Sequence, residues 1–386
     1  MNEQISNILD GAVSGGQAVG AACLVYKGDE EVFSGASGFA DRESGTAMTR
    51  STICRLFSLS KPVTSAAAMI LMDKGLLDPD MPLKEIFPEF GDMVCLDDSG
   101  NVVKCRRDIT ILHLLTMTSG LCYANNFNKA VCSSGKLFDQ IIERQENGTD
   151  MTTAEFVNNA AGLILAFEPG TRWDYGISAD VLGGVIEKLS GMRYGDFLRE
   201  NIFTPLGMND TGFFVPEDKR SRFAGLYNWS EGTLTADHNN YLGLTDYTSP
   251  PAFESGGAGL VSTIDDYSRF ARCLTNGGQF RDVRLMSEKA FRFMTTPQLS
   301  DSQNALWDRL RGYNYGCLVR IMTEPDISEI KTGRGELGWD GWTGTYFSAD
   351  PMTGITTLYF TQIAGAGTTW QAAEVNRIVY DCLVRK

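Results

Sequence analysis

Apolar residues near the start of the chain change from helical spacing to strand alternation and back. Residues 1–14 and the segment after Phe57, which ends at Gly75, predict two helices because their apolar positions recur at helical spacing. Residues 20–26 and 31–37 have the composition of strands and are separated by a short turn. The chain is therefore predicted to begin with a helix, a hairpin and a second helix.

The rest of the chain divides into a helical middle and a strand-rich end. From about residue 80 to 240 strand alternation is unclear, and the spacing predicts helices instead. These helices are expected at 109–117, 153–165 and 179–189, and a further one at 264–274. The last hundred residues predict three strands and a terminal helix, at 315–322, 343–349, 355–362 and 370–384.

These elements predict a mixed α/β (α+β) fold. Both chain ends would build one antiparallel sheet flanked by helices, with a mainly helical lobe inserted between them. The 386 residues exceed the roughly 250 to 300 that one hydrophobic core serves, so two lobes are expected. We predict a sheet domain at 1–80 and 255–386, a helical domain at 81–254, and an active site in the cleft between them.

Charge and cysteine content narrow the environment and the partners. The net charge of −14 repels phosphate backbones and anionic lipid heads, so nucleic acid and membrane are not expected partners. The most apolar stretch, Val63–Met72, is too short to cross a bilayer. Nine scattered cysteines without a CxxC pair favour reduced thiols, and the start of the chain has no secretory pattern. We predict a cytoplasmic protein.

Several kinds of chemistry lack their sequence signatures. The only histidines are His113 and His238, and no GxSxG segment places a serine for a Ser-His-Asp triad. His113 is expected to pack or cap a helix, and His238 to lie in a loop. HExxH, HxH and the glycine-rich nucleotide motifs are absent. No metal and no cofactor are predicted.

A serine activated by a lysine is the remaining candidate chemistry. In the pattern SxxK, helical spacing places the hydroxyl and the amine on the same face. The pattern occurs three times, and only in the pair Ser58/Lys61 does the serine begin a predicted helix. The exposed N–H groups at the start of that helix would stabilise an alkoxide. An ordinary helix cap with a surface lysine explains the same pair equally well. Two further matches have turn-like composition, Ser133/Lys136 and Ser328/Lys331.

The surroundings of Ser58 distinguish these explanations. Residues 55–62 (RLFSLSKP) resemble the nucleophile motif of the class C β-lactamase and penicillin-binding-protein superfamily of serine hydrolases. Four more segments match that superfamily in the same order, at 110–121, 174–183, 256–263 and 338–347. The resemblance covers residues 19–363, is closest in motif to the family VIII carboxylesterases, and implies a β-lactamase/transpeptidase-like fold.

The resemblance also implies roles for individual residues. Ser58 would be the nucleophile and Lys61 the proton acceptor or shuttle. Tyr175 would be the phenolate-type base that also protonates the leaving group. A phenol titrates near pH ~10, so its phenolate needs cations such as Lys61 beside it. By the same resemblance, the oxyanion hole would use the backbone N–H groups of Ser58 and Trp342.

Departures from the β-lactamase pattern shape the predicted substrate. The tyrosine motif YxN has Ile177 in place of asparagine, which weakens recognition of acylamino groups. The strand motif, KTG or HxG in the superfamily, is Trp339-Asp340-Gly341 here and lacks the cation that would pair with a substrate carboxylate. A literal KTG occurs at 331–333, but a turn-like composition follows it. We favour 339–341, which we expect to lead directly into the strand at 342–349.

The sequence thus predicts a serine esterase that hydrolyses small, largely apolar acyl esters through a Ser58 acyl-enzyme, without a cofactor. Within the same fold the alternatives are a D-amino-acid peptidase or amidase, a weak β-lactamase, and an acyltransferase in which an alcohol replaces water. A protein of another class, a sensor that is acylated without turnover, is the non-enzymatic alternative.

Overall fold

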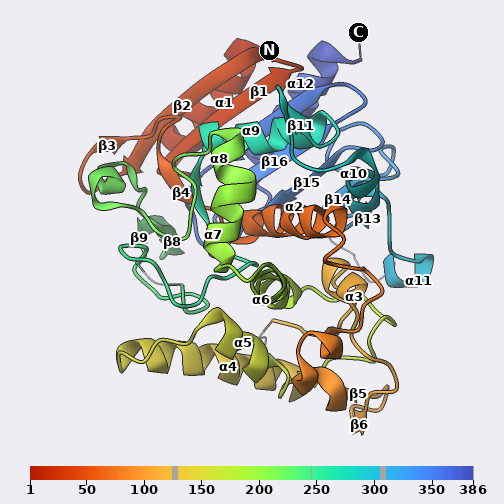
Figure 1. The fold of residues 1–386 in the computed structure, drawn as a ribbon. Coiled ribbons are helices and arrows are strands. Elements are labelled where there is room, and N and C mark those ends of the chain that lie inside the picture. The colour runs from red at the N-terminus through yellow and green to blue at the C-terminus, as the bar shows by residue number, and fades with distance from the viewer. Residues whose placement is uncertain (124–128, 245, 305–309, 386) are drawn as a thin grey trace.

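A computed structural model describes residues 1–123, 129–244, 246–304 and 310–385. Its centre is an antiparallel sheet of eight strands in the order β13-β14-β15-β16-β17-β1-β2-β3 (Figure 1). The strands are β1 (Gly20–Lys27), β2 (Glu30–Asp41), β3 (Thr46–Ala47), β13 (Tyr313–Tyr315), β14 (Arg320–Met322), β15 (Leu337–Asp340), β16 (Tyr346–Asp350) and β17 (Ile355–Phe360). β1 pairs with β17, from Ala22 opposite Phe360 to Lys27 opposite Ile355. The prediction that both chain ends build one antiparallel sheet is confirmed.

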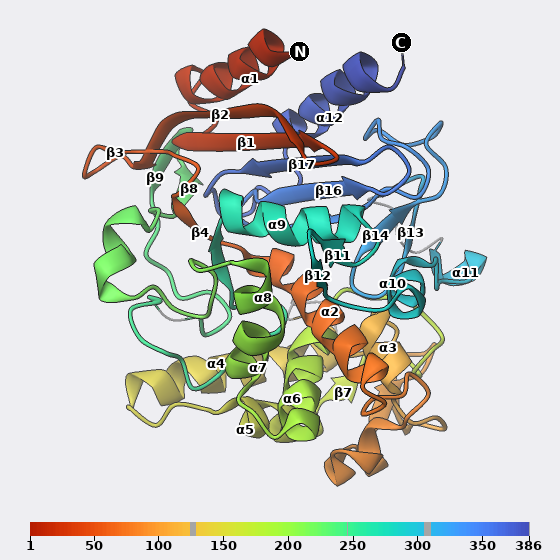
Figure 2. The ribbon, with the colours of Figure 1, turned by 45° about the horizontal axis from the view of Figure 1, so that its top comes forward.

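Helices cover both faces of the sheet. α1 (Asn2–Ser14) and α12 (Trp370–Leu383) lie together on one face, and α9 (Ile264–Thr275) lies on the other (Figure 2). Alternate residues of β1 serve the two faces, since Ala21, Cys23 and Val25 pack into the core beneath α1 and α12. Ala22, Leu24 and Tyr26 belong to the larger core on the α9 side. A strand buried on both faces explains why β1 is apolar almost throughout.

The middle of the chain is mainly helical. In Figure 1, α3 to α6 lie below α2 (Ser60–Asp73), whereas α7 and α8 lie beside it. Its helices are α3 (Ile111–Leu115), α4 (Lys129–Glu146), α5 (Thr153–Ala160), α6 (Ser178–Ser190), α7 (Tyr194–Leu198) and α8 (Thr204–Leu206). The region also contains short strands that the sequence pattern did not reveal. These are β5 (Val94–Leu96), β6 (Val102–Lys104), β7 (Ile164–Leu165), β8 (Tyr227–Ser230) and β9 (Thr233–Ala236).

Two strand pairs and two short helices complete the described part of the chain. β4 (Ile53–Arg55) pairs with β10 (Val261–Thr263), and β11 (Gln279–Phe280) pairs with β12 (Val283–Arg284). The helices are α10 (Glu288–Thr295) and α11 (Asp301–Asn304). Within the described ranges, no helix has both the length and the apolar composition needed to span a membrane.

Four local predictions are wrong. The helix expected at 153–165 ends at Ala160, and Ile164–Leu165 form the strand β7 instead. The single strand expected at 315–322 is two strands, β13 and β14, because Leu318 adopts a left-handed turn conformation with φ of 56°. Residues 339–341 do not lead directly into one strand at 342–349, because β15 and β16 form a hairpin whose turn has Gly344 at φ 83°. The segment 133–136, expected to be turn-like, lies within α4. In 133–136 the glycine and the serines suggested a turn, whereas the strands expected at 315–322 and 342–349 are interrupted by turns that the apolar pattern does not reveal.

Candidate active site

The segment that carries Ser58 is a tight turn between a strand and a helix. After β4, the Leu56 N–H donates to the Leu260 carbonyl at 2.9 Å. The chain then forms the 3-10 turn η1 (Phe57–Leu59) before α2 begins. Phe57 has a φ of 46°, in the left-handed region that side chains rarely adopt. Packing around this turn therefore holds a strained backbone directly before the half-buried Ser58.

Lys61 lies one helical turn further along and is fully buried, with 0% of its surface exposed. Its Nζ donates to Ser58 Oγ at 3.2 Å, to Tyr123 OH at 3.1 Å and to the carbonyl of Gly257 at 2.9 Å. Burial lowers the pKa of Lys61 to about 7, although the nearby carboxyls of Asp180 and Asp340 oppose the shift. A neutral amine within hydrogen-bond reach of Ser58 Oγ can accept its proton.

Tyr175 stands opposite Lys61, just before α6. The backbone around it needs a glycine, because a Cβ atom on Gly176 would collide with the Leu121 carbonyl. The Tyr175 hydroxyl accepts a hydrogen bond from Trp339 Nε1 at 3.2 Å, and a hydrogen bond joins it to the Ser58 side chain. Lys61 Nζ lies 4.5 Å from the centre of the Tyr175 ring.

Burial raises the pKa of Tyr175 above the usual value for tyrosine, and hydrogen bonds from Ser58 and Trp339 only partly oppose this. The resting side chain is therefore a neutral phenol at neutral pH. Of the two groups beside Ser58, the Lys61 amine is the one whose pKa lies near neutrality. Near neutral pH the Lys61 amine is therefore better able to accept a proton than the neutral Tyr175 phenol.

The turn between β15 and β16 packs directly against the nucleophile segment. Thr343 Oγ1 donates to the Arg55 carbonyl at 2.9 Å, and Thr345 Oγ1 donates to the Leu56 carbonyl at 3.1 Å. A Cβ atom on Gly341 would collide with that same Leu56 carbonyl, so only glycine fits. The Trp342 ring packs on Phe57 with 5.1 Å between ring centres. The fold thus brings residues 339–342 to the segment that carries Ser58.

The literal KTG segment lies elsewhere. Residues 331–333 belong to the loop before β15. Lys331 Nζ donates to the Ser328 carbonyl at 2.6 Å, and Thr332 Oγ1 donates to Glu336 at 3.3 Å. The amine and hydroxyl of this segment hold its own loop together, whereas Trp339 contacts Tyr175 directly.

The histidines have the structural surroundings that the sequence suggested. His113 Nδ1 accepts a hydrogen bond from the Thr110 N–H at 3.2 Å and completes the cap of α3. His238 is an exposed loop residue. Among the described residues, no group of three or more histidines, cysteines and carboxylates is arranged to hold a metal ion.

Sequence reasoning did not assign two residues that surround Lys61. Tyr123, which lies just after the matched segment 110–121, accepts the Lys61 hydrogen bond. Asp180, 2% exposed, lies within the matched segment 174–183 and faces the buried amine from α6. The signal for Asp180 was present, since a carboxyl in the first turn of an apolar helix is an uncommon core residue.

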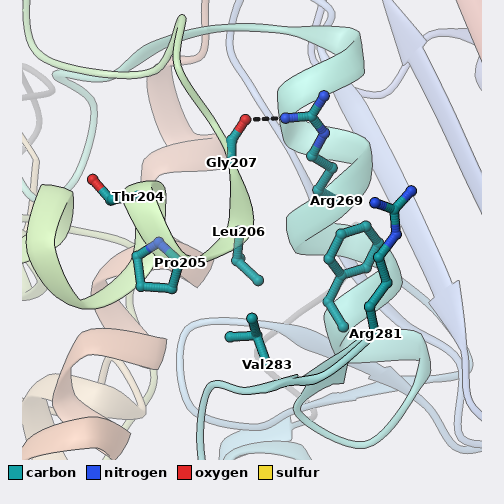
Figure 3. A pocket seen from close by; sticks show the side chains of 8 residues that line it. Thr204, Pro205, Leu206, Gly207, Arg269, Arg281 and Val283 are labelled. Atoms are coloured by element: carbon teal, nitrogen blue, oxygen red, sulfur yellow. Dashed lines mark hydrogen bonds between the residues drawn. The ribbon is translucent and has the colours of Figure 1, made fainter.

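A separate surface pocket with a volume of about 310 Å³ lies beside α8 and α9 (Figure 3). It is lined by the end of α8 and by Phe280 and Val283, and Arg269 and Arg281 extend along its side. The Arg269 guanidinium donates to the Gly207 carbonyl across this pocket. Its lining does not include Ser58, Lys61 or Tyr175, so it is distinct from the candidate site.

Comparisons with known proteins agree with the fold. The family model described as Beta-lactamase matches residues 5–379, so the chain belongs to the beta-lactamase family. Protein Rv1367c of Mycobacterium tuberculosis (strain ATCC 25618 / H37Rv) is 32% identical over 357 residues, covering 89% of this chain and 85% of that protein. Esterase EstB of Burkholderia gladioli is 29% identical over 378 residues, covering 94% and 91%.

The fold is shared with solved structures. EstCE1, a hydrolase with promiscuous acyltransferase activity, has a TM-score of 0.83 to this chain at 23% identity, with 98% of each chain covered. Membership in the family, together with the similarity to an esterase, makes the protein a serine hydrolase of the β-lactamase fold.

Proposed function

We propose that the protein is a carboxylesterase that forms an acyl-enzyme on Ser58. The observation that carries this proposal is the hydrogen bond from the Trp339 indole to the Tyr175 hydroxyl, 3.2 Å long. Trp339 stands at the first position of the strand motif, where the motif of the β-lactamase and penicillin-binding-protein superfamily (KTG or HxG) has a lysine or a histidine. An indole N–H orients the phenol but provides no positive charge for a substrate carboxylate.

Two further features favour neutral ester substrates. Ile177, at the place of the asparagine in YxN, is 0% exposed and forms part of the core, so it offers no group to a substrate. Asp340 follows Trp339 and brings a carboxyl to the surroundings of Lys61. Burial raises the pKa of Asp340, although Arg320 and Lys61 favour its ionised form, and residue 339 adds no cation that could pair with a substrate carboxylate.

The walls around Tyr175 are aromatic. Its ring centre lies 5.6 Å from Tyr123, 6.2 Å from Trp173 and 5.7 Å from Trp339. Aromatic faces bind apolar groups and provide few hydrogen bonds. Small, largely apolar acyl groups suit such a site, and the similarity to Esterase EstB supports an ester as the reacting bond.

In the proposed acylation step, Ser58 Oγ attacks the ester carbonyl carbon and transfers its proton to the neutral Lys61 amine. The bond from carbon to Oγ forms, and the backbone N–H groups of Ser58 and Trp342 stabilise the oxyanion. The bond to the leaving alcohol then breaks, and the Tyr175 phenol protonates the departing oxygen. This leaves a Tyr175 phenolate beside a Lys61 ammonium, and the two opposite charges stabilise each other.

Deacylation reverses these proton transfers. The Tyr175 phenolate takes a proton from water, whose oxygen attacks the acyl carbon. The bond to Ser58 Oγ breaks, and the Lys61 ammonium returns its proton to that oxygen. The carboxylic acid leaves, and serine, amine and phenol regain their resting protonation. The sequence of steps requires only protein groups and water.

The test compares two substrates on two proteins, the wild type and Ser58→Ala. We expect rapid hydrolysis of a short p-nitrophenyl ester, little turnover of a chromogenic cephalosporin, and loss of ester turnover by about 10³-fold in Ser58→Ala. Faster turnover of the cephalosporin, or of a D-amino-acid amide, would contradict the assigned substrate class. Ester hydrolysis that survives in Ser58→Ala would contradict the mechanism.

Acyl transfer is a second candidate, because the structurally similar EstCE1 is a hydrolase with promiscuous acyltransferase activity. The same acyl-enzyme would serve, with an alcohol in place of water. Adding a small alcohol to the ester assay distinguishes the two, since acyl transfer predicts the new ester as a product. We place either activity in the cytoplasm, because the cysteines whose side chains are described are free thiols.

A further inference from the structure

The interior carboxyl on α6 suggests a role that extends the proposed function and rests on it. We propose that Asp180 is a positioning residue for the reaction: it holds Lys61 through the Gly257 peptide and provides the negative charge that stabilises the Lys61 ammonium during turnover.

The two side chains bind opposite ends of one residue. The Gly257 N–H donates to Asp180 Oδ1 at 3.0 Å, and the Gly257 carbonyl accepts from Lys61 Nζ at 2.9 Å. Ser255 Oγ also donates to Asp180 Oδ1, and the same hydroxyl accepts from the Ala258 N–H at 3.0 Å. A carboxylate that orders this short segment therefore also fixes the acceptor of the Lys61 amine.

The segment at residues 256–257 is closely packed. α2 and α6 pack side by side (Figure 1), and residues 256–257 pass between them. A Cβ atom on Gly257 would lie 2.6 Å from Asp180 Oδ2 and 3.0 Å from Tyr123 OH. On the α2 side, Thr64 Oγ1 donates to the Gly256 carbonyl at 2.6 Å. Asp180 and Lys61 thus lie on either side of one closely packed peptide.

The negative charge of Asp180 would also affect the protonation of Lys61. Both Asp180 and Lys61 are buried, so the ammonium formed when Ser58 loses its proton has no access to bulk water. A carboxylate within the same interior stabilises that cation, whereas an apolar residue would not. Burial raises the pKa of Asp180, while Lys61 and the donors of Ser255 and Gly257 favour the ionised form. The other titratable groups that interact with this pair are Asp340, Tyr123, Tyr175 and Tyr194.

The variant Asp180→Asn tests the proposal, because an amide keeps the acceptor oxygen and removes the charge. We expect kcat for a p-nitrophenyl ester to fall by at least about 10-fold with little change in KM. The rising limb of the kcat/KM profile should move to lower pH by about 1 unit, since a lost carboxylate lowers the pKa of Lys61. A second variant, Ser255→Ala, removes one donor to the carboxylate and should shift the limb in the same direction by less.

Asp266→Asn is the matched control. Asp266 is also buried, 5% exposed, and accepts the Asp210 N–H at 2.6 Å, but it lies at the start of α9. Its variant should keep the wild-type pH profile even if it lowers thermal stability. A rising limb that coincides in the wild type, Asp180→Asn and Ser255→Ala would overturn the role of Asp180. If the wild type does not hydrolyse the ester, or if Ser58→Ala still does, the proposed function itself is rejected, and with it the role of Asp180 that depends on it.

Discussion

Two serine–lysine pairs with the same spacing have very different surroundings in this molecule. Ser58 lies in the turn η1 and Lys61 in the first turn of α2, where the amine is fully buried and donates to the serine hydroxyl. Ser133 and Lys136 lie within α4, where the amine is exposed. The Ser133 hydroxyl donates to the Ala130 carbonyl at 2.7 Å and accepts the Ile164 N–H at 3.2 Å.

The difference shows what the SxxK spacing cannot supply. Spacing of three places a hydroxyl and an amine on one helix face in both pairs. A nucleophile also needs an amine that can lose its proton near neutral pH, and burial is what lowers the pKa of Lys61 to about 7. The serine hydroxyl must also not be occupied by hydrogen bonds to the backbone. The Ser133 hydroxyl is occupied in this way, since it accepts the Ile164 N–H and so joins α4 to β7.

Replacing the lysine of each pair should have very different consequences for activity. Lys61→Met should lower kcat for a p-nitrophenyl ester by about 10³-fold, whereas Lys136→Met should stay within about twofold of wild type. In wild type, kcat/KM should rise with pH through about 7, because the amine accepts a proton only when neutral. This limb should disappear from the residual activity of Lys61→Met. Equal losses in both variants would contradict the distinction.

Replacing the two tyrosines beside Lys61 should have smaller and unequal effects. Tyr175→Phe should reduce kcat by about 10²-fold, because it removes the proton donor for the leaving group. Tyr123→Phe should reduce kcat by only about 3-fold to 10-fold, because Lys61 retains Ser58 and Gly257 as partners.

Steady-state kinetics with two leaving groups distinguish the roles of these tyrosines. An ester with a poor leaving alcohol should be affected more than a p-nitrophenyl ester in Tyr175→Phe, since the poorer leaving group depends more on protonation. Tyr123→Phe should affect both esters alike. If Tyr123→Phe showed the stronger dependence on the leaving group, the two assignments would have to be exchanged.

Local periodicity predicted the elements that hold Ser58, because helix and strand patterns depend on neighbouring residues. The helix after Phe57 is present as α2, and its predicted end at Gly75 matches a left-handed glycine with φ of 70°. The hairpin at the N-terminus and the strand expected at 355–362 were also found close to their predicted positions, as β1, β2 and β17. Family resemblance added the order of the motifs and the choice of Ser58 among three SxxK matches.

The remainder of the site depends on contacts between distant parts of the chain. Trp339 and Tyr175 are joined by a hydrogen bond across 164 positions, and Lys61 and Gly257 across 196. No periodic pattern reports such pairs. The β15–β16 hairpin was missed for a related reason, since its turn is fixed by Thr343 and Thr345 binding the backbone before Ser58. Burial of Lys61 likewise follows from packing between α2 and α6 and cannot be derived from the spacing.

The most direct test of the account is the location of the acyl group. The wild-type protein is mixed with a p-nitrophenyl ester, quenched in acid within milliseconds, digested and analysed by mass spectrometry. The account predicts one acyl group per chain on the peptide that contains Ser58, and none in Ser58→Ala, with Ser133→Ala identical to wild type. An acyl group on Ser133, or on any other residue while Ser58 stays unmodified, would contradict it.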